Sequence, residues 1–193
     1  EETDAAEQGP LIPEPEVTAE FTNCSEPGGE RNIYDLQDPQ CPDHISPQPT
    51  DSPGVAMSLS DVVVTAVFGD TFFVQESSGG PYSGIAVYAP VGLSELSVGD
   101  VVDLEGSYYE FYGLTQFNLG DKSDYTIVDA TTPLSPFPIV HPAHVATGGP
   151  LAEMFEGVLI TVSDVRTIDT KPDCPHEYGE FVVTGDLRID DME

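Results

Sequence analysis

The chain has 193 residues, enough to bury one sizeable core or two small ones. It carries 35 acidic residues against 5 basic ones, a formal net charge of −30, so it repels polyanions and lacks the counterion release that drives non-specific nucleic-acid binding. No run of about 18 apolar residues occurs, which excludes a membrane-spanning helix of ordinary composition.

The first fifty residues are acidic and rich in Pro and Gly, apart from a short apolar patch at 32–38. Such a segment buries too little apolar surface to offset its chain entropy, so residues 1–50 are predicted to be a tether and a loop. An acidic, Pro-rich start is also typical of a mature end left after removal of a signal peptide. The pattern favours an exported, extracellular protein held at the cell surface in the manner of a lipoprotein.

Residues 51–130 have the β pattern of a small barrel. Runs of β-branched and aromatic residues alternate with turn signals, the clearest being Gly69-Asp70 between the first two strands. Gly106 lies where a long fourth strand is expected to bend. Strands are expected within 60–77 (two strands), 83–90, 99–113 and 114–130. Five antiparallel strands without a clear helix predict a closed or nearly closed all-β barrel.

A Pro-rich linker at 131–150 separates this barrel from a second β pattern at 151–193. Leu151, Met154 and Phe155 have the spacing of a short helix, which is expected to lead into a strand at 158–168. A hairpin follows at 181–189, turning at Thr184-Gly185-Asp186.

These elements supply about three of the five strands that a small barrel needs. Leu187 and Ile189 share one face of the last strand and are expected to require a core. We therefore expect the second unit to pack on the first barrel, to be completed by a further polypeptide, or to receive strands from a neighbouring subunit.

The three cysteines lie near Pro, Gly and acidic residues, which favours an oxidising compartment. Cys24 and Cys41 enclose 16 residues, and a disulfide between them would stabilise the folded chain by roughly 3 kcal/mol. This pairing is the favoured prediction. The alternative is a zinc site, because Cys and His are the ligand types of tetrahedral zinc. Its candidate ligands are Cys41, His44, Cys174 and His176.

Short motifs recur in a fixed order from residue 33 to residue 191. They are IYDLQD, VVVTAVFGDTFFVQES, GIAVYAP, LSVGDVVDLEGSYYEFYGLTQF, LAEMFEGVLITV and GEFVVTGDLRIDD. This series is similar to the OB-fold modules that accompany secreted bacterial nucleases. The resemblance implies an OB-fold-like five-stranded barrel followed by a second, incomplete OB-like unit. The metal-dependent phosphodiesterase domain of those nucleases, which belongs to the endonuclease/exonuclease/phosphatase class, has no counterpart in these residues.

No G-x-S-x-G, H-E-x-x-H or P-loop motif occurs, so the expected function is a non-enzymatic binding or accessory module. Two alternatives remain open. The chain is the N-terminal accessory part of a secreted nuclease, or it is an acidic structural subunit of an extracellular assembly.

OB folds bind ligands across strands 2 and 3 and the flanking loops, with aromatic rings as stacking platforms. Alternation requires one ring of Phe72/Phe73 and one of Tyr108/Tyr109 to face inward. The candidate ligand-binding residues are Phe73, Tyr88, Tyr109, Tyr112 and Gln116. Residues 51–130 hold 12 acidic side chains and a single basic one, Lys122. A sugar or a peptide therefore fits these rings better than a nucleic acid.

Two further metal signals are weak. Asp190-Asp191 and the loop at 119–124 offer oxygen ligands for Ca²⁺, but neither has the EF-hand spacing. His141 and His144 lie in the Pro-rich linker, where exposed histidines without a metal are expected. No cofactor is predicted.

Overall fold

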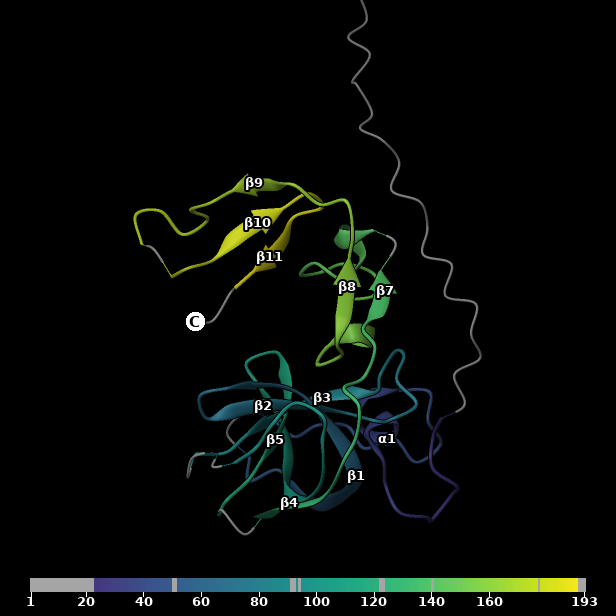
Figure 1. The fold of residues 1–193 in the computed structure, drawn as a ribbon. Helices are drawn as coiled ribbons and strands as arrows, with labels where there is room; N and C mark the ends of the chain where they lie inside the picture. Colours follow the sequence, from purple (N-terminus) through teal and green to yellow (C-terminus); the bar gives the residue numbers. More distant parts are fainter. Residues whose placement is uncertain are drawn as a thin grey trace, which may run out of the picture.

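The structure is a computed structural model that describes residues 23–49, 52–90, 93, 95–121, 124–139, 141–176 and 178–190 (Figure 1). Its largest part is a five-stranded barrel. The strands are β1 (Val55–Phe68), β2 (Thr71–Gln75), β3 (Gly84–Tyr88), β4 (Asp100–Phe111) and β5 (Leu114–Asn118). They follow the order β1-β2-β3-β5-β4, and a β1–β4 pairing closes the barrel. Among the pairings of these five strands, the one between β3 and β5 is parallel and the others are antiparallel. This is the strand order of an OB fold, so the predicted fold class is confirmed.

The barrel forms because alternate residues of its strands are apolar. Phe72, Tyr108 and Phe117 are fully buried, and Val, Leu and Ile side chains fill the space between them. Gly106 lies at the predicted bend, where a Cβ would come within 2.5 Å of the Asn118 carbonyl oxygen. A residue without a side chain therefore lets β4 bend where its outer pairing changes from β6 to β5.

A sixth strand corrects one expectation about residues 114–130. They were expected to form one strand of the barrel, but they form β5 and a separate β6 (Tyr125–Ala130), which pairs with the first half of β4. The chain turns between them, where the Asp124 carboxylate accepts hydrogen bonds from the backbone N–H groups of Gly120 (2.7 Å) and Asp121 (2.6 Å). β4 is long enough to pair with β5 along one half and with β6 along the other.

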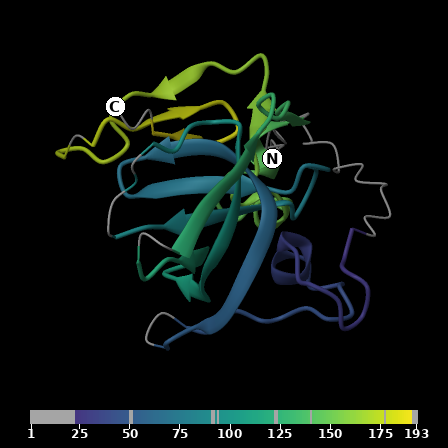
Figure 2. The same cartoon turned by 60° about the horizontal axis from the view of Figure 1, so that its bottom comes forward.

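A short helix lies inside the segment that was expected to be tether and loop. α1 (Ile33–Gln37) begins with a capping box between Asn32 and Asp35. Ile33 and Leu36 are buried in the barrel core, and the Tyr108 hydroxyl donates to the Leu36 carbonyl (2.8 Å). Figure 2 shows α1 beside the barrel, away from the strands of the C-terminal part.

The predicted disulfide is confirmed. Cys24 and Cys41 are bonded, with their Cα atoms 5.5 Å apart. Because Cys41 follows α1 and Cys24 precedes it, the bond encloses the helix and holds it against the barrel.

A second, smaller core follows the barrel. β7 (Phe137–Ile139) and β8 (Ile160–Val162) pair in parallel, and two 3₁₀ turns, η2 (Pro142–His144) and η3 (Glu153–Phe155), lie between them. Ile139, Leu151, Phe155 and Val158 form the buried cluster of this unit. The expected linker thus contributes a strand and a core residue, and the expected helix is a single 3₁₀ turn.

The last described residues form what we call the arm (residues 163–190). It holds β9 (Thr167–Asp169), β10 (Phe181–Val183) and β11 (Leu187–Ile189), in the antiparallel order β11-β10-β9. The predicted hairpin at 181–189 is confirmed. The single strand expected at 158–168 is wrong, because the chain leaves the extended conformation between β8 and β9, where Asp164 has a φ of 57°.

The arm stands to one side of the barrel and joins the molecule through the β7–β8 unit (Figure 1). Gly185, in the hairpin turn, lies so close to η2 that a Cβ would approach the Ala143 nitrogen to 2.7 Å. In the described part of the chain, no helix has the length and apolar character needed to cross a bilayer.

Candidate functional site

The outer surface of the barrel gathers the predicted ligand-binding residues. Strand register places Phe73 beside Ala86, Ala86 beside Gln116, and Gln116 beside Tyr109, so four strands contribute one continuous row. Phe72 and Tyr108 are fully buried, and their neighbours Phe73 and Tyr109 therefore point outward, as alternation predicts. With strands about 4.8 Å apart, the two rings are separated by roughly 14 Å. Ala86 and Gln116 lie between them and are both buried, at 0 % and 6 % exposed.

Tyr109 is held in place on this row. Its hydroxyl donates to Gln116 Oε1 (3.0 Å), and burial together with the nearby Tyr88 raises the pKa of Tyr109. The phenol therefore stays neutral at physiological pH and remains a hydrogen-bond donor. Phe73 is supported from the other side by an edge contact with Phe68 (ring centroids 6.3 Å apart).

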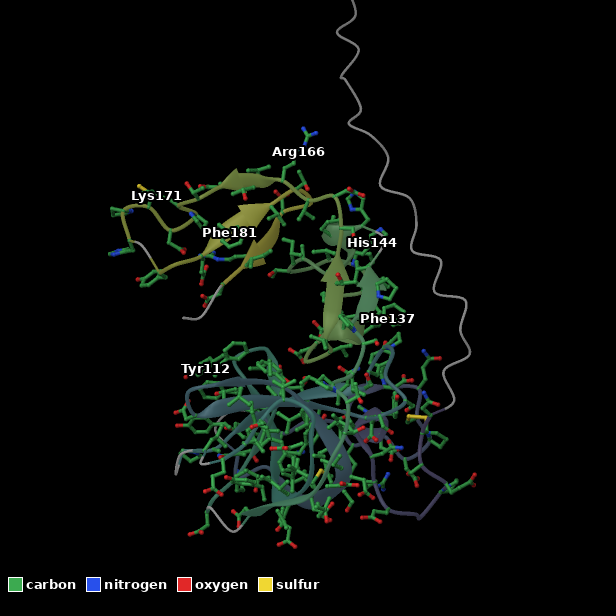
Figure 3. The ribbon with its side chains drawn as sticks, viewed as in Figure 1. Tyr112, Phe137, His144, Arg166, Lys171 and Phe181 are labelled. Atoms are coloured by element: carbon green, nitrogen blue, oxygen red, sulfur yellow. A yellow bond between two sulfur atoms is a disulfide. The ribbon has the colours of Figure 1, made fainter. Side chains whose placement is uncertain are left out.

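The turn between β4 and β5 continues the row with two exposed rings. Phe111 is 43 % exposed and Tyr112 is 85 % exposed. Edge-to-face contacts link Tyr109 to Phe111 (6.3 Å) and Phe111 to Tyr112 (4.9 Å). In Figure 3, Tyr112 lies at the edge of the barrel nearest the arm. We call Phe73, Tyr88, Tyr109, Phe111, Tyr112 and Gln116 the aromatic face.

All five residues predicted from the sequence thus lie on one side of the barrel, and whether they bind a ligand stays a prediction. Sequence reasoning missed Phe68, Ser107 and Asn118. Asn118 lies between Tyr88 and Ser107 in the next row of the same surface. Counting two residues along each strand from Tyr109 and Gln116 would have found Ser107 and Asn118.

The β7–β8 unit is attached to the barrel at what we call the junction. Tyr82 N–H donates to the Met154 carbonyl (2.6 Å), and Leu159 N–H donates to Gln75 Oε1 (2.9 Å). Gly84 and Gly157 lie backbone against backbone, where a Cβ on either residue would collide with the other segment. The segment before β8 therefore covers one end of the β3 strand.

Two carboxylates meet at the junction around one threonine. Thr115 N–H donates to Glu156 Oε2 (3.2 Å), and Thr115 Oγ1 donates to Glu110 Oε2 (3.1 Å). Burial, with the charges of Glu153 and Glu110, raises the pKa of Glu156. Glu156 therefore attaches the second unit to the barrel through Thr115, whereas the bond between Thr115 and Glu110 lies within the barrel.

The loop between β2 and β3 holds α1. Glu76 Oε1 accepts a hydrogen bond from Ile33 N–H (2.8 Å), and burial with the charges of Asp35 and Asp61 raises the pKa of Glu76. The Tyr34 hydroxyl donates to the Gly79 carbonyl (2.7 Å). This loop is therefore occupied by the chain's own N-terminal segment.

The motifs behind the resemblance have a structural role at these contacts. Asp35 caps α1, and Gln37 Nε2 donates to the Gly84 carbonyl (2.8 Å). Gln75, Thr115 and Glu156 form the junction. The motif residues thus fix three segments of the chain to one another.

The zinc alternative is wrong. The Cys41 sulfur is bonded to Cys24, whereas Cys174 is exposed on the arm. His44 Nδ1 lies 3.1 Å from the Asp35 carbonyl oxygen, and the His176 ring stacks on Tyr178 with centroids 5.9 Å apart. Cys41 and His44 therefore lie beside α1, whereas Cys174 and His176 lie on the arm.

The weaker metal signals also have local explanations. In the 119–124 loop the Asp124 carboxylate caps a turn, and residues 122 and 123 lie outside the described residues. Asp191 lies outside them as well. His144 was expected to be exposed but is buried, 4 % exposed, because the linker folds over the second core.

No protein-family model matches this chain, and no curated protein or solved structure does either. The aromatic face and the junction are therefore interpreted from their own geometry.

Proposed function

We propose that this chain is an exported, non-enzymatic OB-type binding module whose aromatic face holds a sugar or a peptide. The observation that carries the proposal is the row from Phe73 through Ala86 and Gln116 to Tyr109. Two outward rings on one surface, with the Gln116 amide beside the Tyr109 hydroxyl, suit a ligand that offers a ring face or an apolar side chain together with hydrogen-bonding groups.

The charge of the chain supports a ligand other than a nucleic acid. Residues 51–130 hold 12 acidic residues and one basic residue, so phosphates would be repelled from this surface. Stacking itself does not require a phosphate, and it contributes about 1–3 kcal/mol per base in single-strand binders. A neutral or cationic ligand keeps the stacking energy without the repulsion.

Export is supported by two independent features. The Cys24–Cys41 disulfide is of the kind that persists in oxidising compartments. The resemblance to modules of secreted proteins points the same way. The acidic, Pro-rich residues 1–22, which lie outside the described residues, would then serve as a tether to the cell surface.

Binding to glycan and peptide arrays, followed by calorimetry with the best ligand, tests the proposal. Tyr109→Ala should weaken binding by about tenfold or more, because it removes one of the two aromatic rings of the row. Tyr178→Ala is the matched control, since this ring is 66 % exposed but belongs to the arm. Equal affinity for the wild type and Tyr109→Ala with every ligand found would overturn the proposal.

A second candidate is that the chain is the N-terminal accessory part of a secreted nuclease. The observation in its favour is that the residues of the resembling motifs build the junction, which suits a module made to hold a further unit in place. Reading the gene beyond the codon of Glu193 for a phosphodiesterase domain tests this candidate. Such a domain, or another polypeptide, would also be the partner expected to complete the C-terminal unit.

A further inference from the structure

An open hollow of about 550 Å³ continues the aromatic face along β4. That volume is within the range of roughly 300–1,000 Å³ that ligand sites occupy. The lining residues come from β1, β4, β5 and the turn before β6: Ala56, Met57, Ser58, Glu105, Gly106, Ser107, Asn118, Gly120 and Asp124. Register places Ser107 beside both Ala56 and Asn118, two residues before Tyr109 on β4. The hollow and the aromatic face therefore belong to one continuous surface.

The charged side chains among these lining residues are Glu105 and Asp124, and both are acidic. Ser58 and Ser107 add hydroxyl groups, which donate or accept hydrogen bonds. Asp124 Oδ2 accepts two backbone hydrogen bonds and so is fixed in orientation at the edge of the hollow. Glu105 is exposed on β4. In the β1–β4 register it lies opposite Ser58.

The side chain of Asn118 has a hydrogen-bond acceptor that lacks a donor. Its side-chain oxygen Oδ1 is buried and has no hydrogen-bond partner among the described residues. Asn118 is paired in register with Tyr88, which places it beside the aromatic face. A buried carbonyl oxygen without a donor is unfavourable, so rotation of the Asn118 side chain toward a ligand N–H or O–H group in the hollow would satisfy it.

We infer that this surface binds a basic peptide, with a lysine or arginine side chain in the hollow between Glu105 and Asp124. The ammonium or guanidinium group satisfies Asn118 Oδ1 and offsets the two carboxylates. The rest of the peptide runs along β4 over Tyr109 and Phe111, whose ring faces attract further cations. This inference rests on the proposed function, because it names the ligand class for the same outer surface.

Calorimetry with an acetylated, amidated pentalysine peptide tests it, with the matched peptide of acetyl-lysines and a cello-oligosaccharide as neutral probes. The variant is the pair Glu105→Gln with Asp124→Asn, which keeps the Asp124 hydrogen-bond acceptor. The control is the pair Glu95→Gln with Asp129→Asn, which removes the same charge from exposed positions outside the hollow. We expect pentalysine to bind, and the hollow pair to weaken binding about tenfold while the control pair changes it less than twofold.

An equal loss in both pairs would show attraction to the overall charge alone and would overturn the inference. Tighter binding of the acetyl-lysine peptide or of the oligosaccharide, sensitive to Tyr109→Ala, would also overturn it and leave the proposed function standing. If no probe and no array ligand depends on Tyr109, the inference and the proposed function both fail. A loss on Asn118→Ala with pentalysine, but none on Ser46→Ala, would support the hydrogen bond at Oδ1.

Discussion

The barrel and the arm differ in how much of each is buried. The barrel core contains fifteen buried residues, most of them fully excluded from solvent. In the arm, β9 is exposed along its whole length, and Val183 is the buried residue of β10. Strand alternation in the barrel is enforced by a core on one side, whereas the arm is held by a hairpin turn and by ion pairs around Arg188. Measured stability should therefore be dominated by the barrel, and the arm should respond to whatever covers it.

The largest expected effect is in the barrel core. Phe72 is fully buried, so Phe72→Ala should lower the free energy of unfolding by about 3–5 kcal/mol through lost burial and a residual cavity. Ile168→Ala in the arm, where the side chain is 55 % exposed, should change it by less than about 0.5 kcal/mol. Urea unfolding measures both. Similar losses for the two variants would mean that the arm shares one cooperative core with the barrel.

The disulfide gives the second effect. Replacing Cys24 and Cys41 with Ala should lower the free energy of unfolding by about 2–4 kcal/mol, because the unfolded chain regains the freedom of its loop. Cys174→Ala is the control, since that cysteine is exposed on the arm. Hydrogen exchange should locate the loss at α1. Loss of exchange protection elsewhere, with unchanged protection at α1, would contradict a role of the disulfide in holding the helix.

The junction connects the two regions and should depend on pH. The pKa of Glu156 is raised above its ordinary value of 4.5 because burial penalises the charged form. The stabilisation from this group is therefore complete below about pH 4.5 and is lost as pH rises through the raised pKa. Glu156→Gln stays neutral at every pH and still accepts from Thr115 N–H, so it should abolish that part of the pH dependence.

Unfolding of the wild type, Glu156→Gln and Glu95→Gln between pH 4 and 8 measures this effect. Acidification also relieves the repulsion of the whole acidic chain, so only the difference between variants reports on Glu156. Glu95 is exposed and lies outside the junction, and its replacement should leave the slope close to that of the wild type. An identical slope of the free energy of unfolding against pH in all three proteins would show that Glu156 does not contribute to the pH dependence.

The same contrast explains what the sequence predicted well. The alternation in 51–130 depends on local pattern, and it correctly assigned Phe72 and Tyr108 to the core. What it missed depends on distant contacts. Ile33 is buried because Glu76 and Tyr108 hold α1 from positions far along the chain. His144 is buried by the fold of a linker that looked polar and Pro-rich. The aromatic face was predictable as a set of residues, whereas the hollow beside Asn118 required the strand register.

The smallest effect belongs to the arm itself. Arg188 on β11 forms ion pairs with Asp173 and Glu180, and its side chain is 45 % exposed. Exposed pairs contribute about 0.2–1 kcal/mol, so Arg188→Met should barely change global unfolding. It should, however, speed hydrogen exchange in β10 and β11, because few buried contacts hold these strands. Arg31→Met is the matched control, since Arg31 pairs with Asp43 beside the barrel. High salt should reproduce the arm effect in the wild type by screening the pairs. If β10 and β11 exchange as slowly in Arg188→Met as in the wild type, packing against η2 rather than the ion pairs holds the arm.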